Sequence, residues 1–371
     1  MRCETKTDQP APFLTQIPDW RDQNRITYEW NALWTLMLVG LLTGPENILA
    51  LSDWFQAQRE VLCQHLALPS SIPSQATLYR FFWKLDVHIT DLQTALFAWV
   101  KACHPVVDTE RLVLLAGDGK VLKGSARQGE AALSFLSVFF HELALTVAQT
   151  PQNGRHEARV MDGLLDTLHH LFGTGWLLTL DAAYTEQGLT GRIINAGGAY
   201  LVPLKNNTKT LKSWAQVAFA YPPTTTFCDV EHRCGEDWTR TTCTQTDIPE
   251  EVSYTFPAAQ TLIRRVHHVC HRDGRVTQEV RYAVCSMLLT AHEAEDIWRQ
   301  HWGIENRSHH RRDTIFHEDR CRTRLGAQGL ALLHGTFLAL LHAQTRRLTA
   351  FVRRLRFDPL AILTLLGVEP S

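Results

Sequence analysis

The stretch "RLVLLAGDGKVLKG", Arg111 to Gly124, decides the fold that this sequence predicts. It opens with an apolar run of strand length and then places Asp118 between two glycines. A second stretch, "GWLLTLDAAY" at residues 175–184, repeats this arrangement, because its apolar run ends at Asp181. Strands this apolar are expected in the middle of a sheet, and acids at their ends lie where open α/β sheets bind ligands. Either aspartate alone could be an ordinary turn residue or helix cap.

The segments around these stretches predict a mixed α/β core. Strand-length apolar runs occupy residues 131–142 and 143–151, and a helical pattern covers Glu157–Leu171. Beyond Asp181 a helix and a further strand are expected. Strands that come first and then alternate with helices argue for a mixed sheet flanked by helices. We therefore assign residues 106–213 to the first part of this core.

Residues 214–290 have a different composition, rich in threonine, valine and charged side chains. Their longest strand-like piece contains Asp273–Gly274, a dipeptide typical of a hairpin turn. These residues predict a β-rich insertion. From Ala291 the pattern is helical again, with breaks, to Leu366. We therefore expect residues 291–371 to provide helices that complete the core.

The first part of the chain, residues 1–105, is expected to form a helical domain. Its apolar residues follow helical spacing at 30–41, and Ser74 is placed to cap a helix that carries Tyr79 and Arg80. The turn and short helix could belong to a helix-turn-helix reader of DNA. Helical packing alone explains the same pattern, so both interpretations stay open.

Charge is balanced over the whole chain and uneven along it. The formal net charge is −1, from 37 Lys and Arg against 38 Asp and Glu, so the chain is not a polycation. Between Ile297 and Phe357, however, twelve arginines stand against four acids. Arginine binds phosphate through a planar fork of donors, which suggests an anionic polymer as partner. A solvated helical face explains this charge equally well.

Cysteines and apolar runs bear on where the protein works. The nine cysteines are odd in number and form no C-x-x-C motif, which fits a reducing cytosol better than a disulfide framework. Residues 1–20 carry charges of both signs and no long apolar run, so we expect no secretory signal. The most apolar run, Ala32–Thr43, is too short to span a bilayer, so no membrane partner is expected.

The stretch "HWGIENRSHHRRDTIFHED", residues 301–319, allows three interpretations: a zinc site, a solvated charged helix, or one corner of an active site. If residues 297–312 form one helix, a single side of it carries Trp298, His301, Glu305, His309 and Arg312. Zinc is disfavoured, because the two histidines on this side are more than two helical turns apart. A second set of zinc-type residues also lacks the spacing of a zinc finger: Cys228, His232, Cys234 and Cys243.

The active-site interpretation begins with the two strand-end aspartates. Carboxylates brought together at one edge of a sheet repel one another. Magnesium, which takes oxygen ligands, would neutralise Asp118 and Asp181 there. The residues alone do not say whether Glu305 joins them.

Three stretches of this sequence resemble the catalytic blocks of bacterial insertion-sequence transposases of the DDE class: "DGKVLKGS", "LLTLDAAYTEQ" and "HWGIENRSHHRRDTIFHEDRCRTR". The likeness is greatest to the ISAs type, also called H-repeat-associated proteins. The wider superfamily carries Tyr-x2-Arg-x3-Glu-x6-Lys, and those places hold Trp298, His301, Glu305 and Arg312 here. "IPDWRD" and "SQATLYRFFWKLD" resemble the helical domain that precedes the nuclease core in this group. The resemblance therefore covers nearly the whole chain.

This resemblance implies an RNase H-like core in which Asp118, Asp181 and Glu305 hold two magnesium ions, with manganese able to substitute. Two such ions can activate the attacking oxygen and stabilise the leaving oxygen of a phosphodiester displacement. The implied function is hydrolysis and strand transfer at insertion-sequence ends. The implied partner is double-stranded DNA of the element ends and the target, with a homodimer in synapsis typical of such enzymes. The implied location is the bacterial cytoplasm, with the nucleoid.

Six further residues are predicted to contact DNA on the same grounds: Lys120, Lys123, Lys205, Trp298, His301 and Arg312. The cations would contact phosphates, and the tryptophan would stack on a displaced base. For each cation, a surface salt bridge is the competing explanation, and for the tryptophan it is core packing.

The sequence departs from the family pattern at several places. "GRHE" at residues 154–157 keeps only the glutamate of the usual Lys-Ser-Asn-Glu, Thr208 ends an altered Lys-Gly-Asn-Gln, and Trp238 replaces an expected glutamate. These departures make a domesticated or decayed DNA-binding protein without transposition activity the alternative. Intact acids at all three catalytic positions favour the active enzyme.

Overall fold

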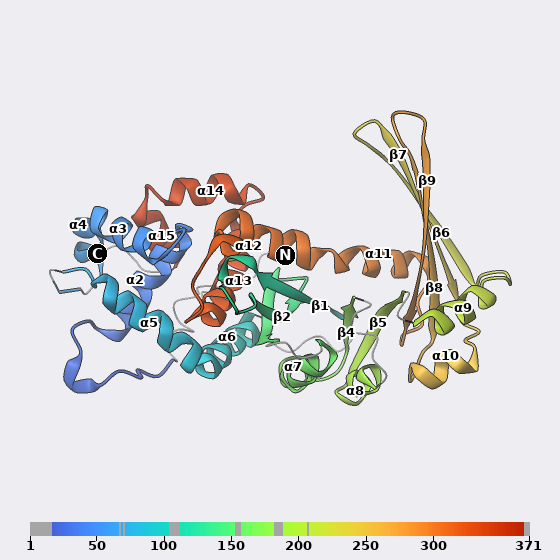
Figure 1. Ribbon diagram of the computed structural model, residues 1–371, viewed down its shortest axis with the longest axis horizontal. Coiled ribbons are helices and arrows are strands. Elements are labelled where there is room, and N and C mark those ends of the chain that lie inside the picture. The colour runs from blue at the N-terminus through green and yellow to red at the C-terminus, as the bar shows by residue number, and fades with distance from the viewer. Residues whose placement is uncertain are drawn as a thin grey trace.

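The computed structural model describes residues 17–66, 68–69, 71–103, 112–152, 157–181, 188–205 and 208–366. Its centre is a nine-stranded sheet in the order β3-β2-β1-β4-β5-β9-β8-β7-β6 (Figure 1). The strands are β1 (Val113–Leu122), β2 (Leu133–Phe140), β3 (Leu145–Pro151), β4 (Trp176–Leu180), β5 (Gly198–Leu204), β6 (Thr225–Arg233), β7 (Glu236–Gln245), β8 (Thr261–Cys270) and β9 (Val276–Cys285).

The first five strands have the order and directions of an RNase H-like core. β1 pairs antiparallel with β2, and β2 with β3, while β1 to β4 and β4 to β5 are parallel. β1 and β4 are the two apolar stretches that end near aspartates in the sequence, and they are neighbours in the middle of the sheet. The predicted mixed sheet with flanking helices is therefore confirmed.

Helices cover both faces of this core. α7 (Glu157–Phe172) and α8 (Leu189–Asn195) pack on one face. The other face receives α11 (Ala291–His301), the π-helix η5 (Ile304–His309), α12 (His310–Ile315) and α13 (Ala327–Gln344). Gly117 allows α7 to pack closely on β1, because a Cβ at this position would lie 2.7 Å from side-chain atoms of Leu180 and of Met161 in α7.

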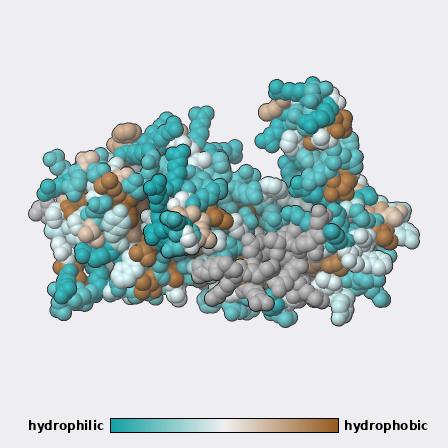
Figure 2. Space-filling model, viewed as in Figure 1, coloured by the Kyte–Doolittle hydropathy of each residue, from teal (hydrophilic) through white to brown (hydrophobic). Residues whose placement is uncertain are grey.

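The predicted β-rich insertion is a continuation of the central sheet. β9 pairs antiparallel with β5, and β6 to β9 form two long hairpins beside α9 (Lys209–Ala218) and α10 (Glu250–Thr255). The β8–β9 turn contains Gly274 at a φ of 80°, as the Asp-Gly dipeptide predicts. The hairpins project from one end of the body as an arm (Figure 1). Figure 2 shows that this arm is mostly hydrophilic on the face in view.

The N-terminal part is helical, as expected. Its helices are α2 (Trp30–Leu42), α3 (Ile48–Ala57), α4 (Arg59–His65), α5 (Gln75–Val87) and α6 (Ile89–Cys103). Ser74 caps α5 by accepting a hydrogen bond from the Thr77 amide. α13 packs against β3 and also against α5, which joins the N-terminal helices to the core.

The last two helices extend this junction. α14 (Leu348–Leu355) contacts α12, and α15 (Pro359–Leu365) contacts α2. Arg356 between them donates hydrogen bonds to the carbonyl oxygens of Thr43 and Gly44 at 2.6 and 2.9 Å. These helices therefore bind the N-terminal helices in addition to the core. Across the described ranges, no helix has the length and apolar character needed to cross a membrane.

Candidate active site

Three carboxylates from three different elements line one cleft. Asp118 comes from the middle of β1, Asp181 follows the last residue of β4, and Glu305 comes from η5. The cleft has a volume of about 760 Å³, and one wall of it is formed by Glu279–Tyr282 of the arm. Parallel pairing of β1 with β4 places the two aspartates at the same edge of the sheet. Glu305 reaches that edge from the helical face above it.

The helix that carries Glu305 is not continuous, which corrects the sequence expectation for residues 297–312. α11 ends at His301, and the π-helix η5 separates it from α12. A π-helix adds one residue per hydrogen-bonded turn and rotates everything after it. The five residues expected on one helix side therefore do not share a single environment. π-turns are rare and occur frequently at functional sites.

The three carboxylates interact electrostatically. Burial raises the pKa of Glu305, and the nearby charges of Asp118 and Asp181 raise it further. Lys205 binds Asp181 at 2.6 Å, and His309 Nδ1 lies 3.4 Å from Asp118 Oδ2. Each aspartate thus has a cation or imidazole beside it.

The structure brings the three acids into one cleft without gathering them into a tight cluster. Among the residues it describes, no group of three or more His, Cys, Asp or Glu side chains is close enough to hold a metal ion. The expected convergence within metal-bridging reach is therefore not present, and the zinc interpretation gains no support either.

The donor set nevertheless fits magnesium. Asp118, Asp181 and Glu305 offer carboxylate oxygens, and no cysteine is among the residues that line the cleft. Hard divalent cations prefer such ligands, and Mg²⁺ needs only one or two carboxylates besides substrate and water oxygens. Burial is the main cause of the raised pKa of Glu305, and the charges of Asp118 and Asp181 add the part that a cation would relieve.

His301 lies in the cleft beside the acids. Thr179 donates its hydroxyl hydrogen to the carbonyl oxygen of Leu115 at 3.0 Å, and its oxygen lies 2.9 Å from His301 Nδ1. The ring therefore donates from Nδ1 to this oxygen. Burial lowers the pKa of His301, against the opposing charges of Asp118 and Asp181, so the imidazole is neutral near pH 7.

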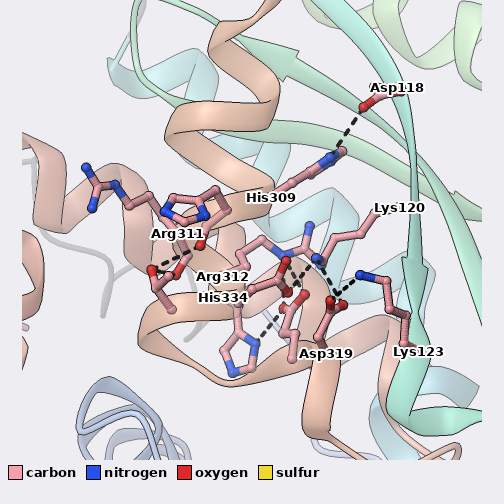
Figure 3. Close-up of polar contacts among 12 residues, drawn as sticks. Asp118, Lys120, Lys123, His309, Arg311, Arg312, Asp319 and His334 are labelled. Carbon is pink, nitrogen blue, oxygen red and sulfur yellow. Dashed lines mark hydrogen bonds and ion pairs between the residues drawn. The ribbon is translucent and has the colours of Figure 1, made fainter. Parts of the chain in front are cut away.

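Two of the predicted phosphate contacts are buried in ion pairs instead. Lys120 is 5% exposed and binds Asp313 at 2.6 Å. Arg312 is fully buried, where its Nε lies 2.9 Å from Glu318. Figure 3 shows both side chains pointing into the interface between β1 and the following helices. Their expected role as exposed DNA contacts is not compatible with this burial.

Three acids of the stretch 301–319 are the partners of these cations: Asp313, Glu318 and Asp319. Asp313 and Asp319 lie 2.6 and 3.7 Å from Lys120 of β1, and Asp319 also binds Lys123, just beyond the strand, at 2.9 Å. Glu318 accepts from Arg312 and lies 2.7 Å from His334 Nδ1. Lys123 and Lys205 remain largely exposed, although each is paired with an aspartate.

The predicted stacking residue Trp298 is a core residue. It is 5% exposed and packs with Leu177 and Leu201 on the face of the sheet that α11 covers. Trp302 is 43% exposed and lines the same cleft beside Glu305. The sequence analysis missed Trp302, because its place at the end of α11 depends on where the helix stops. The "HWG" string that contains it was the available signal.

Two further cations of the cleft were missed, Lys212 of α9 and Arg281 of β9. Their sequence neighbourhoods carry no motif that separates them from other surface cations. Of the family departures, residues 154–156 lie outside the described parts of the chain. Thr208 directly precedes α9, and Trp238 packs beneath Arg240 of the arm at 5.5 Å.

Comparison with known proteins places these features in a family. The model described as "Transposase DDE domain" matches residues 126–341, and "DDE_Tnp_1-associated" matches residues 11–100. Two Escherichia coli (strain K12) proteins, "Putative protein YbfL" and "H repeat-associated putative transposase YhhI", are each 23% identical over 330 residues. In both cases 84% of each chain is covered.

A third Escherichia coli (strain K12) relative, "Putative transposase YncI", is 22% identical and covers 53% of this chain and 77% of its own. Among solved structures, the piggyBac transposase synaptic complex with hairpin DNA matches at a TM-score of 0.43 and 9% identity. It covers 98% of this chain and 79% of that one. The family match rests on the sequence models and not on this distant likeness.

Proposed function

We propose, because this chain belongs to the DDE transposase family, that Asp118, Asp181 and Glu305 are the acids with which it cuts and joins DNA. Membership of the family makes the protein a DNA transposase of the nuclease and strand-transferase kind. Neither the fold nor the relatives favour the alternative of a domesticated or decayed DNA-binding protein without transposition activity. The division into an N-terminal helical domain, a split core and a β-rich insertion is proposed to separate DNA binding from catalysis.

Two magnesium ions would be held by the three carboxylates, with manganese as a substitute. When bound, such ions activate the attacking oxygen and stabilise the leaving oxygen of an in-line displacement at phosphorus. The carboxylates supply oxygen ligands, and His309 holds Asp118 through its Nδ1 hydrogen. The protein's own task is then positioning and charge neutralisation, because phosphoryl transfer needs little covalent participation from side chains.

The cleft offers contacts for the DNA that carries the scissile phosphate. Lys205, Lys212 and Arg281 line it and can neutralise phosphates. Trp302 presents an exposed aromatic surface on which an unpaired base could stack, the role that its sequence neighbour Trp298 is too buried to fill. Neutral His301 could accept a hydrogen bond from the substrate at Nε2. Element ends and target would both be double-stranded DNA of the nucleoid, cut by a homodimer in synapsis.

One observation carries this proposal. Asp118, Asp181 and Glu305 line one cleft, although they come from β1, the end of β4 and η5. A fold gains no stability from bringing three like charges into one cleft. A cation-dependent function explains the arrangement.

The experiment is a nicking assay on a plasmid that carries the DNA flanking this gene, with magnesium or manganese. Wild-type protein is expected to nick near terminal inverted repeats. Asp118→Ala is expected to abolish nicking and to leave DNA binding intact, because it removes a metal ligand and no basic contact. Glu142→Ala, an acid on the β2–β3 turn that does not line the cleft, is the matched control. Equal nicking by wild type and Asp118→Ala would overturn the assignment.

A further inference from the structure

We infer that a ladder of charge pairs between β1 and the segment after Glu305, centred on Lys120 and Asp313, sets the position of Glu305 relative to Asp118. Lys120 and Asp313 are thus positioning residues that touch neither DNA nor metal. The inference rests on the proposed function and deepens it, because it names what aligns two of the three acids.

The ladder begins with the alternation of β1. Residues 116, 118, 120 and 122 share the face that packs on η5, α12 and α13, because side chains alternate along a strand. Ala116 belongs to the same small buried cluster as Ile304. Leu122 belongs to another with Ala327. The face is therefore apolar at both ends and charged in the middle, where Asp118 and Lys120 lie.

Each charged residue on this face has a partner further along the helical segment. Asp118 meets His309, Lys120 meets Asp313 at 2.6 Å, and Lys123 just beyond the strand meets Asp319 at 2.9 Å. The partners follow the order of the strand. A step of two residues along a strand spans about 6.6 Å, and the four-residue step from His309 to Asp313 spans about 6 Å along a helix. The two repeats match, so the pairs form in register.

The π-helix places His309 beside Asp118, the first pair of the ladder. Ile304 and His309 are five residues apart, which in an α-helix would turn them about 140° away from each other. The i→i+5 repeat of the π-helix places both toward β1. Glu305 follows Ile304 directly, so the same turn that seats Ile304 against Ala116 carries Glu305 to the cleft.

A second layer of charge holds the ladder from behind. Asp313 and Asp319 face β1, whereas their neighbours Arg312 and Glu318 point inward and join each other. His334 of α13 completes that inner group (Figure 3). Its ring also stacks on Phe316 at a ring separation of 4.3 Å. Asp313 and Asp319 thus join the segment to β1 and its end. The adjacent Arg312 and Glu318 join it to His334 of α13. Slippage of the segment would break both layers together.

The test compares two isosteric substitutions at equally exposed aspartates. Asp313 is 28% exposed and pairs with a lysine that is 5% exposed. Asp229 on the arm is 29% exposed and pairs with Arg240, which is 8% exposed. Asp313→Asn and Asp229→Asn therefore remove one carboxylate charge each from a similarly buried pair. Lys120→Met and Arg240→Met repeat the comparison from the cationic side.

Two quantities are measured well below the melting temperature. Mn²⁺ binding is followed by loss of the free-ion electron paramagnetic resonance signal, and nicking is measured at saturating Mn²⁺ and plasmid DNA. We expect Asp313→Asn and Lys120→Met to weaken Mn²⁺ binding about tenfold or more and to lower kcat, as loss of an outer-shell partner does. Asp229→Asn and Arg240→Met are expected to lower Tm comparably and to change neither quantity.

The outcomes separate this inference from the proposed function. If Asp313→Asn and Lys120→Met bind Mn²⁺ and nick as the arm variants do, the ladder only stabilises the fold and the inference is wrong. If Asp118→Ala nicks like wild type, the proposed function fails, whatever the ladder variants do. Weakened Mn²⁺ binding in the ladder variants, together with inactive Asp118→Ala, supports both.

Discussion

His309 Nδ1 lies 3.4 Å from Asp118 Oδ2, which joins the residue four positions after Glu305 to the first strand of the core. Burial lowers the pKa of His309 against the pull of Asp118, so the ring is a neutral donor near pH 7. A donor that orients a metal-binding carboxylate typically contributes 10–100-fold to metal affinity or activity. Under the proposed role of Asp118 as a metal ligand, this contact would orient that carboxylate.

We predict that His309→Ala lowers the nicking rate by about 10–100-fold while DNA affinity stays within about twofold. The nicking assay with Mg²⁺ and a filter-binding measurement check this. His310→Ala is the control, because its imidazole is exposed and does not contact Asp118. Loss of activity to the same extent in both variants would show that the Asp118 contact is not the cause.

Substitution of Trp298 in α11 and of Trp302, the residue that follows α11, is predicted to have different effects. Trp298→Ala removes a buried side chain and should destabilise the fold by about 3–5 kcal/mol. Trp302→Ala should leave Tm nearly unchanged, and it should weaken binding of a single-stranded oligonucleotide by about 1–3 kcal/mol, the cost of one lost base stack. Thermal melts and fluorescence anisotropy measure the two effects. Unchanged oligonucleotide affinity in Trp302→Ala would exclude the stacking role.

The sequence predicted the core better than it predicted the site. β1 and β4 were visible because apolar runs ending in an acid depend only on local pattern. The Lys120–Asp313 pair was not, because the two residues lie 193 positions apart and nothing local distinguishes a buried lysine from an exposed one. The π-helix was missed for a similar reason. Its extra residue aligns the segment with the side chains of β1, and helical periodicity in the sequence does not predict such a tertiary contact.

Glu318 gives the fold a predicted pH dependence. Burial alone would raise its pKa, but the charge of Arg312 and the hydrogen bond from His334 outweigh burial and lower the pKa to about 2. The ionised form therefore stabilises the fold above pH 4.5, and this contribution is lost as the pH falls from 4.5 toward 2. The shift corresponds to about 3 kcal/mol.

Glu318→Gln is accordingly predicted to lower the free energy of unfolding by about 3 kcal/mol at pH 7, and the difference from wild type should shrink as the pH falls below 4.5. Urea unfolding at pH 7, 5 and 3.5 measures it. Glu130→Gln is the control, because its partner Arg324 lies 3.2 Å away on the surface, where such a pair contributes about 0–1 kcal/mol. A difference that stays constant with pH would contradict the pKa assignment.

Lys205 binds Asp181 at 2.6 Å, so its ammonium group competes with the proposed metal for one of the three carboxylates. We predict that Lys205→Met binds Mn²⁺ more tightly than wild type, because the competing cation is gone. Lys212→Met removes a positive charge from the same cleft without removing that contact, so its gain should be smaller. Calorimetric titration with Mn²⁺ compares the two.

The same substitution gives a prediction for DNA binding. A metal that displaces Lys205 from Asp181 would release the ammonium group to a DNA phosphate. Lys205→Met should therefore reduce the salt dependence of DNA binding by about one phosphate contact, and only when Mn²⁺ is present. The same reduction without Mn²⁺ would mean that Lys205 contacts DNA independently of Asp181.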